Sequence, residues 1–220
     1  MLIEQLISPV IPTLQPTDTG SRALYLMEEN HLMQLPLLVE EKYLALVQEN
    51  ELLDWHTPES PLSGGDFLKY KPAVFASGHP YEALRIAHLY DLDIVPVVDR
   101  SNTYLGAITR NSLLRFITEN GGLANPGGII VLEIPRLDYS LTDVARICEN
   151  ERVVITSTQL GTDLDGEMFY LTLKTDRTDL GGVVNSLERH GYRIKEVFGE
   201  QGHTEDMLER YKNLMSYINV

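Results

Sequence analysis

Metal binding is the first chemistry that the residue types of this chain could support, because histidine, cysteine and carboxylate side chains are all present. The six histidines are His31, His56, His79, His88, His190 and His203. They show no HxH or HExxH spacing, and with a single cysteine, Cys148, a zinc site is not expected. The stretch Asp163-x-Asp165-Gly166 begins like a calcium loop, but Lys174 stands where such a loop ends in glutamate. We therefore expect a solvated hairpin turn there.

Phosphate and covalent chemistry have little support in the sequence. The glycine pairs Gly64-Gly65 and Gly181-Gly182 are not followed by Lys-Ser/Thr, so neither forms an ATPase-type phosphate loop. Cys148 falls on a predicted helix, where we expect it to pack in the core rather than act as a nucleophile. No acid–base pair or nucleophile set stands out, although residues distant in sequence could still cluster. The residue types therefore favour a regulatory or binding protein over an enzyme.

The stretch around which the chain is organised spans residues 91–114. An apolar run at 94–98 predicts a buried strand, and the polar residues 99–103 predict a tight turn. Residues 104–109 predict a second strand, and a helix is expected from Ser112 onward. An extended segment and a helix precede this stretch, so the complete unit reads β-α-β-β-α.

A weaker copy of this unit lies about 60 residues earlier. Its predicted strand, turn, return strand and helix are residues 35–39, 40–42, 43–47 and 51–55. Pro36 matches Pro96 at an offset of 60, while Leu52-Leu53 match Leu113-Leu114 at 61, because the second turn is one residue longer. The agreement of proline, turn and apolar runs predicts an internal repeat.

A glycine-rich linker, residues 121–127, separates the repeat from a region of different pattern. Residues 128–200 predict the order β-α-β-β-α-β, which is the ferredoxin-like or split-βαβ arrangement. The tail, residues 201–220, predicts an amphipathic helix at 204–218. Its apolar stripe is Met207, Tyr211, Leu214, Met215 and Ile218. This helix is expected to pack either on its own domain or on a partner subunit.

The composition of the chain bears on its domain count, its partners and its cellular compartment. The 220 residues suffice for one large or two modest domains, and no apolar run approaches the length of a membrane span. Acidic residues outnumber basic ones by 32 to 18, which gives a formal charge of −14 and disfavours nucleic acid or anionic lipid as partners. The single cysteine and the absence of a signal-peptide pattern predict a cytoplasmic protein.

The repeated unit resembles the CBS domain, the cystathionine-β-synthase-type module that occurs in tandem pairs. The residues that carry the resemblance are 35–38, 94–99 and 105–109. On this basis, residues 1–60 and 67–120 would be the two CBS repeats. Residues 128–200 look like an ACT-type regulatory domain, and the combination is similar to proteins of the acetoin-utilisation regulator family. The expected fold class is therefore mixed α/β and α+β.

The resemblance implies ligand sites in the clefts between the two repeats, where the family often binds adenosine-containing ligands. The family pattern is Gly-x-x-Ser/Thr-x-x-Asp, whose hydroxyl contacts phosphate or ribose and whose acid accepts hydrogen bonds from the ribose hydroxyls. In the second repeat the glycine is Gly106 and the hydroxyl is Thr109, but Ser112 replaces the acid. In the first repeat, Gln48 replaces the hydroxyl and Glu51 replaces the acid.

The full set of expected site residues follows from that carry-over. It consists of Thr13, Pro36, Gln48, Glu51, Ala73, Val95, Pro96, Thr109 and Ser112. The candidate ligands are AMP, ADP, ATP and S-adenosylmethionine. The departures at positions 48, 51 and 112 keep an alternative open, in which the pair is a dimerising scaffold or protein-interaction module without a nucleotide. In either case the resemblance implies a homodimer.

In the ACT-like region, the family binds amino acids through the loop after the first strand. Here that loop is residues 135–140, and it lacks the glycine that lets backbone approach a carboxylate. Amino-acid sensing is therefore a weaker expectation than a regulatory role for the chain as a whole.

Overall fold

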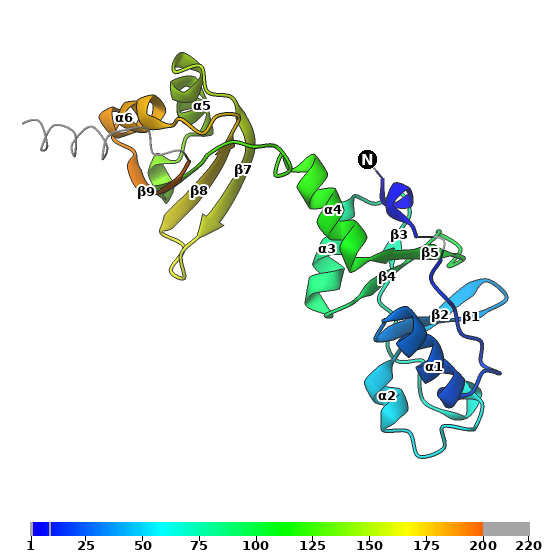
Figure 1. Cartoon of the computed structure of the whole chain (residues 1–220). Coiled ribbons are helices and arrows are strands. Elements are labelled where there is room, and N and C mark those ends of the chain that lie inside the picture. The colour runs from blue at the N-terminus through cyan, green and yellow to red at the C-terminus, as the bar shows by residue number, and fades with distance from the viewer. Residues whose placement is uncertain (1, 9, 200–220) are drawn as a thin grey trace, which may run out of the picture. The chain divides into compact units, whose positions relative to one another are not determined.

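The computed structural model describes residues 2–8 and 10–199, and the expected helix at 204–218 lies outside them. The chain divides into two compact units, Met1–Phe116 and Ile117–Val220, and each is considered by itself (Figure 1). Among the described residues, no helix has the length and apolar character needed to cross a bilayer.

The first half of unit one is built on a two-stranded antiparallel hairpin. Its elements are η1 (Ile3–Leu6), α1 (Gly20–Asn30), β1 (Gln34–Val39), β2 (Lys42–Gln48), α2 (Glu49–Leu53) and η2 (Leu62–Gly64). Helix α1 begins where the Thr19 side chain accepts a hydrogen bond from the Arg22 amide. Helix α2 begins at Glu49, directly after β2 and two residues before the expected start at 51.

The second half repeats this plan with one further strand. Its elements are β3 (Val74–Phe75), α3 (Pro80–Leu89), β4 (Ile94–Val98), β5 (Tyr104–Thr109) and α4 (Arg110–Asn120). Strand β3 pairs in parallel with β4, and β4 pairs antiparallel with β5. In the first half, β3 has only a single counterpart residue: Leu14 forms an isolated parallel bridge with Leu37.

The two hairpins share one pairing register. Leu35 pairs with Val47 in the first hairpin, and Val95 pairs with Ile108 in the second. Residues of β4 therefore lie 60 positions after their β1 counterparts, and residues of β5 lie 61 after those of β2. The register shift also recurs at the same place, after Leu37 and after Val97.

Reciprocal hydrogen bonds join the two hairpins about a pseudo-twofold axis. The Tyr43 amide donates to the Asn102 carbonyl at 3.1 Å, and the Tyr104 amide donates to the Glu41 carbonyl at 2.7 Å. Tyr43 and Tyr104 are equivalent positions, as are Glu41 and Asn102, so each bond is the image of the other. The two repeats therefore contact each other through the same backbone groups, as expected when a duplicated unit packs against its own copy.

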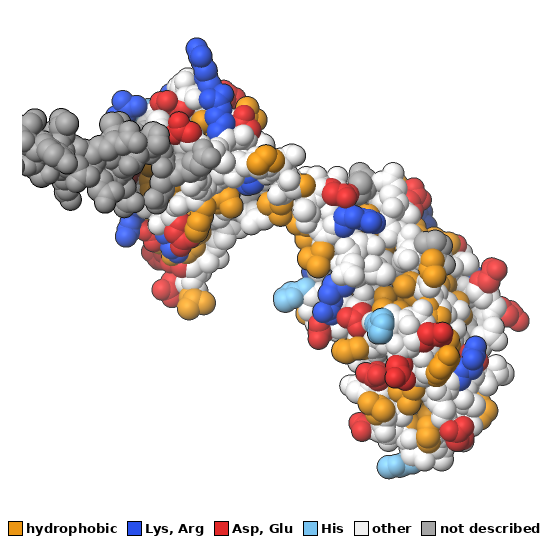
Figure 2. All heavy atoms as spheres, in the orientation of Figure 1, with side chains coloured by type: hydrophobic (Ala, Val, Ile, Leu, Met, Phe, Trp, Pro, Cys, Tyr) orange, Lys and Arg blue, Asp and Glu red, His pale blue; other side chains and the backbone are white. Residues whose placement is uncertain are grey.

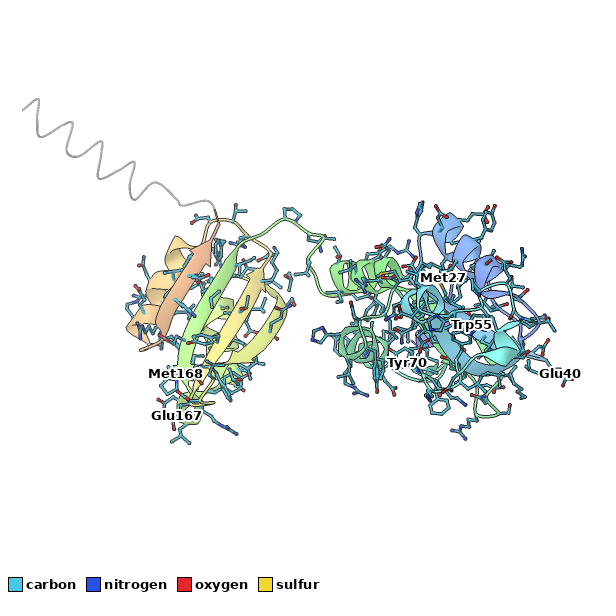
Figure 3. The ribbon with its side chains drawn as sticks, turned by 90° about the horizontal axis from the view of Figure 1, so that it is seen from below. Met27, Glu40, Trp55, Tyr70, Glu167 and Met168 are labelled. Carbon is cyan, nitrogen blue, oxygen red and sulfur yellow. The ribbon has the colours of Figure 1, made fainter. Side chains whose placement is uncertain are left out.

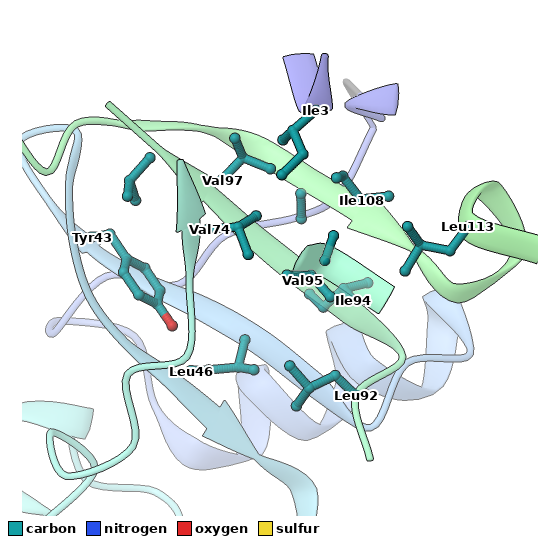
Figure 4. Packing of buried hydrophobic residues seen from close by; sticks show 13 residues of the cluster. Ile3, Tyr43, Leu46, Val74, Leu92, Ile94, Val95, Val97, Ile108 and Leu113 are labelled. Atoms are coloured by element: carbon teal, nitrogen blue, oxygen red, sulfur yellow. The ribbon is translucent and has the colours of Figure 1, made fainter. Parts of the chain in front are cut away.

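One apolar core draws on both halves of unit one (Figure 4). Tyr43 and Leu46 from the first hairpin pack with the buried Ile94, Val97 and Ile108 of the second. A second cluster lies mainly within the first half, beneath Trp55, which is labelled in Figure 3, and the Trp55 ring meets the Phe67 ring edge to face with centres 5.0 Å apart. The shared core makes the two repeats one folding body.

Unit two is a four-stranded antiparallel sheet with two helices. Its elements are β6 (Ile129–Pro135), η3 (Arg136–Asp138), α5 (Leu141–Asn150), β7 (Ile155–Thr162), β8 (Met168–Thr175), α6 (Gly181–Arg189) and β9 (Arg193–Phe198). The strand order is β7-β8-β6-β9, with antiparallel neighbours throughout. This is the split-βαβ arrangement.

Helices α5 and α6 cover one face of this sheet (Figure 1). Alternate residues of β6, Ile130 and Leu132 among them, pack with Ile147 of α5 and Leu187 of α6. Cys148 is fully buried in this core, as expected, and burial raises the pKa of its thiol to about 11. The polar stretch 163–167 forms the turn between β7 and β8, also as expected.

Candidate functional site

A cavity of about 420 Å³ opens at the start of helix α4 and is lined by both halves of unit one. Its lining residues are Ile11, Asn30, His31, Leu32, Asp93, Thr109, Arg110 and Asn111. The first half supplies Ile11 and the three residues 30–32 at the end of α1. The second half supplies Asp93, which directly precedes β4, and residues 109–111, where β5 passes into α4. We call this cavity the α4 cleft.

Thr109 marks the junction at which β5 becomes α4. Its Oγ1 accepts a hydrogen bond from the Ser112 amide at 3.0 Å and lies 2.9 Å from the Ser112 hydroxyl. Thr109 therefore caps the helix, which is why α4 starts at Arg110, two residues before the expected Ser112. The two expected ligand-binding hydroxyls lie together, but they bond to each other.

Arg110 and Asp93 carry the charges of the α4 cleft. The Arg110 guanidinium lies 2.9 Å from an oxygen of Asp91 and 3.3 Å from an oxygen of Asp93. It also donates to the Leu92 carbonyl at 3.1 Å. The Asp93 side chain is 23% exposed, so its carboxylate is held by protein groups and still reaches the cavity.

Asp93 also ties the cleft to the first half of the unit. Its second carboxylate oxygen accepts from the Met33 amide at 3.1 Å, and its own amide donates to the Gln34 side chain at 3.0 Å. The Gln34 amide group in turn donates to the Asp91 carbonyl at 3.4 Å. These bonds fix the start of β1 against the start of β4.

His31 stands beside the cleft in an unusual backbone conformation. Its φ is +54°, in the left-handed region that ends helix α1, and its amide donates to the Glu28 carbonyl. This turn directs the chain from α1 into Leu32, which forms an apolar part of the lining. The cleft thus combines apolar side chains with amide, imidazole and charged groups.

The other residues expected in the second repeat lie near Thr109 in sequence or pairing but not in the lining. Val95 is 1% exposed and belongs to the shared core, and Pro96 is buried. Ala73 is half-buried and precedes Val74 of β3. Of the second-repeat set, the structure places Thr109 in the lining of the α4 cleft.

The residues expected in the first repeat form a separate group. A Glu51 oxygen accepts from the Gln48 amide at 3.3 Å, which brings these two together at the start of α2. Pro36 is buried and accepts from the Leu14 amide at 2.8 Å, with the exposed Thr13 adjacent. The structure therefore does not unite the two expected sets, and each remains in its own half.

The pseudo-symmetry identifies the counterpart of the α4 cleft at the start of α2, where the charges differ. The equivalent of Thr109 is Gln48, and the equivalent of Arg110 is Glu49. Asp91 occupies the position that corresponds to His31. Asp91 is paired with Arg110, but Glu49 puts a carboxylate where the α4 cleft has the Arg110 guanidinium, and this makes the α2 side less favourable for an anionic ligand. The two sides are therefore not equivalent binding sites.

Residues missed by sequence reasoning supply most of the α4 cleft. His31 and Leu32 are distant from Thr109 in sequence and reach it through the pairing of the two halves, whereas Asp93 reaches it because its neighbour Ile94 in β4 pairs with Thr109 in β5. Arg110 directly follows Thr109 and could have been noticed as the cation beside the expected hydroxyl. Asp93 could have been noticed as the acidic residue directly before the buried strand 94–98.

The loop after β6 was the expected site in unit two. The Arg136 amide donates to the Glu167 carbonyl at 2.9 Å, and the Arg136 guanidinium lies 5.8 Å from the Phe169 ring centre. Tyr139 meets the same ring edge to face at 5.4 Å. The loop is held against the β7–β8 turn by these contacts. Within residues 2–8 and 10–199, no group of three or more His, Cys, Asp or Glu side chains is placed to hold a metal ion.

Comparison with known proteins gives partial matches. No protein-family model matches the sequence. The chain is 27% identical over 166 residues to an inosine-5′-monophosphate dehydrogenase of Korarchaeum cryptofilum, in a match that covers 69% of this chain. The chain spans about a third of the length of that relative, 34%.

The solved structures to which the chain is similar include CBS-pair proteins. One is a CBS domain pair/ACT domain protein of Thermotoga maritima, 18% identical, with a TM-score of 0.48 over 54% of this chain and 98% of that one. Another is an acetoin utilization protein of Vibrio cholerae, 21% identical, with a TM-score of 0.48 over 56% and 95%. The third is CBSX2, known from Arabidopsis thaliana and solved in complex with AMP. It is 20% identical, with a TM-score of 0.47 over 54% and 96%.

Proposed function

We propose that unit one is a CBS-type pair that binds an adenosine-containing ligand in the α4 cleft and that the chain is a non-catalytic regulatory protein. The observation that carries this proposal is the placement of Thr109. It lies at the hydroxyl position of the family pattern and lines a cavity built from both repeats. The common register of the two hairpins supports the same assignment.

The chemistry of the lining suits a nucleoside. Ile11 and Leu32 offer apolar surface for a base, and Asn30 and Asn111 offer amide groups for hydrogen bonds. A volume of about 420 Å³ lies within the range of about 300–1,000 Å³ that is typical of small-molecule pockets.

Asp93 offers a replacement for the acid that the family pattern places at position 112. Ser112 cannot accept two charge-assisted hydrogen bonds from a ribose, but a carboxylate can. The Asp93 carboxylate lines the same cavity as Thr109 and retains acceptor capacity beyond its bonds to Met33 and Arg110. We assign it the role of ribose acceptor.

A thermal-shift measurement on the full chain tests the proposal with AMP, ADP, ATP and S-adenosylmethionine. A ligand at about 100 times its dissociation constant stabilises the folded state by about 2.7 kcal/mol, and the melting temperature should rise. Asn111→Trp should abolish the rise by filling the cleft, whereas Arg115→Trp, also on exposed α4 surface, should retain it. No shift with any of the four at millimolar concentration would contradict nucleotide binding.

A second candidate function, a homodimer held by the helices of unit one, has its own observation. Leu53 of α2 and Leu114 of α4 are equivalent positions, and they are 67% and 58% exposed. Next to Leu114, a cavity of about 270 Å³ between α3 and α4 is lined in part by Leu84 and Ala87. Exposed apolar groups at matching positions on both repeats suit the helices of a second copy.

Sedimentation of the double variant Leu53→Glu, Leu114→Glu tests this second candidate. Two charges at the proposed contact should convert a dimer to a monomer. Arg115→Glu changes charge on the same helix and should leave the mass unchanged. A wild-type chain that sediments as a monomer at all concentrations would contradict the homodimer.

We extend the regulatory proposal to unit two as an ACT-like domain. Its split-βαβ topology supports this assignment, as does the loop position between β6 and α5. Figure 2 shows acidic and basic side chains on both units, and the excess of acidic over basic residues in the sequence, 32 to 18, supports the expectation that nucleic acid is not a partner.

A further inference from the structure

We propose that the α4 cleft selects among adenosine-containing ligands by charge, accepting those with a neutral or cationic group on the ribose and disfavouring di- and triphosphates. Asp91 and Asp93 are the residues that impose this selection. The inference rests on the proposed adenosine site, and it adds the chemical class of ligand that the site accepts.

The guanidinium of the cleft is already engaged by the protein. Among the described residues of the lining, Arg110 is the one lysine or arginine. Its Nη2 atom lies 2.9 Å from an oxygen of Asp91 and 3.3 Å from an oxygen of Asp93, and its Nε atom donates to the Leu92 carbonyl at 3.1 Å. A guanidinium held in this way has fewer donors left for the oxygens of a phosphate.

The backbone at the start of α4 is engaged as well. The N-terminus of a helix attracts anions because its first amide groups lack acceptors within the helix. Here the Arg110 amide donates to the Asp93 carbonyl at 2.7 Å, and the Ser112 amide donates to the Thr109 hydroxyl at 3.0 Å. Acceptors of the protein therefore already occupy both kinds of group that commonly hold a phosphate, the guanidinium and the helix amides.

The ionic group around Arg110 has an excess of negative charge. Two carboxylates, those of Asp91 and Asp93, face a single guanidinium. The Asp93 side chain is 23% exposed, so water screens its charge less than it screens a fully exposed carboxylate. The chain as a whole has a formal charge of −14, which adds to the repulsion of anions.

This excess charge lies where it can distinguish ligands that share an adenosine. Asp93, the proposed ribose acceptor, is itself one of the two acids. The group attached to the ribose 5′ carbon therefore lies within about one Debye length, about 8–10 Å, of the negative group. ATP carries a triphosphate at that carbon, whereas S-adenosylmethionine carries a cationic sulfonium there. The first is repelled by the group around Arg110, and the second is attracted.

Calorimetric titration of the full chain with four ligands tests the selection. Adenosine is the uncharged reference, and S-adenosylhomocysteine is the matched control for S-adenosylmethionine because it lacks the sulfonium charge. At low salt, S-adenosylmethionine should bind about threefold to tenfold more tightly than S-adenosylhomocysteine, and ATP should bind about tenfold more weakly than adenosine. Added salt should strengthen ATP binding, weaken S-adenosylmethionine binding and leave adenosine unchanged. The titrations are made at pH 8, where an ordinary imidazole is uncharged.

The variant Asp91→Asn tests the source of the selection without altering the lining of the cleft. Asp91 has a φ of +48°, a left-handed conformation that asparagine also adopts readily, so the backbone should be retained. Loss of this carboxylate frees part of the Arg110 guanidinium. ATP should then bind about threefold or more tightly than to the wild-type chain, while adenosine binding stays unchanged. The control Asp66→Asn removes an equal charge from another exposed ion pair, that with Lys69, and should change neither affinity.

The outcomes separate this inference from the proposed function. ATP that binds the wild-type chain more tightly than adenosine, and that weakens with added salt, would overturn the charge selection and leave the adenosine site standing. Equal effects of Asp91→Asn and Asp66→Asn on ATP binding would also overturn the selection. If none of the four ligands bound, the adenosine site would fail and the selection with it.

Discussion

The rings of Tyr43 and Tyr104 lie stacked with centres 6.4 Å apart, at equivalent positions of the two repeats, but their hydroxyl groups differ. The Tyr43 hydroxyl donates to the Pro72 carbonyl at 2.9 Å. The Tyr104 hydroxyl is buried and has no hydrogen-bond partner among the residues that the structure describes. Burial raises the pKa of both phenols. The two repeats therefore match in backbone structure, but of these two hydroxyl groups only that of Tyr43 has a hydrogen-bond partner among the described residues.

Tyr43→Phe and Tyr104→Phe should have unequal costs. The first removes a buried hydrogen bond and leaves the Pro72 carbonyl without its donor, for a loss of about 1–2 kcal/mol in the free energy of unfolding. The second removes an unsatisfied group and should be neutral or stabilising. Urea denaturation followed by fluorescence of Trp55, the single tryptophan, measures both in unit one. Equal losses in the two variants would contradict the hydrogen-bond assignment.

Gly106 should resist substitution because of Ile7. Its φ of +134° is in a region that suits glycine, and an added Cβ would meet the Ile7 Cγ2 atom. The first repeat carries Ala45 at the equivalent position. Gly106→Ala should destabilise unit one by about 1–3 kcal/mol, and the cost should fall in an Ile7→Ala background. Additive costs in that double-mutant cycle would show that the contact with Ile7 is not the cause.

Thr109 should contribute to stability as a helix cap, independently of any ligand. Thr109→Ala removes the acceptor of the Ser112 amide and should cost about 1 kcal/mol, whereas Thr109→Ser keeps the hydroxyl and should retain most of the stability. The same denaturation experiment applies. If Thr109→Ser were as destabilising as Thr109→Ala, the methyl group and not the cap would account for the loss.

Asp99 should make the β4–β5 turn sensitive to acid. Hydrogen bonds from the Thr103 amide, with further bonds from Ser101, hold the pKa of its carboxyl below the usual value. The folded state therefore binds this proton less readily than the unfolded state. The resulting stabilisation is present above the ordinary pKa of aspartate, about 3.9, and is lost as pH falls through the lower folded value. A carboxyl-carbon NMR titration measures the shift, and a normal midpoint would contradict it.

Local pattern was enough to predict the hairpins and most helices. Strands β1 and β4 are both apolar and carry a proline at the equivalent position. The pairing of β1 with β2 repeats in the pairing of β4 with β5 at the predicted offset. The apolar residues from Val153 onward predict a strand that starts there, but β7 begins at Ile155, because Val153 packs into the core of unit two before the strand pairs. Such boundaries depend on tertiary packing, which a local window does not contain.

The α4 cleft depended on contacts that no local pattern encodes. Its lining joins Leu32 to Thr109 through bonds such as that from the Met33 amide to Asp93. In the first half the counterpart of β3 is a single bridge at Leu14. Its short length likewise depends on tertiary contacts and not on the local sequence pattern. The resemblance located Thr109, but the other lining groups come from both repeats, among them His31 and Leu32 from the first and Asp93 and Arg110 from the second.

Isothermal titration calorimetry with AMP and S-adenosylmethionine tests the central claim most directly, because Asn111 and Asn50 are equivalent positions in the two repeats. One saturable site per chain is expected for at least one of these ligands. Asn111→Trp should weaken it by about tenfold or more by steric exclusion, and Asn50→Trp should leave it unchanged. Loss of binding in Asn50→Trp with retention in Asn111→Trp, or no binding to the wild-type chain at millimolar ligand, would contradict it.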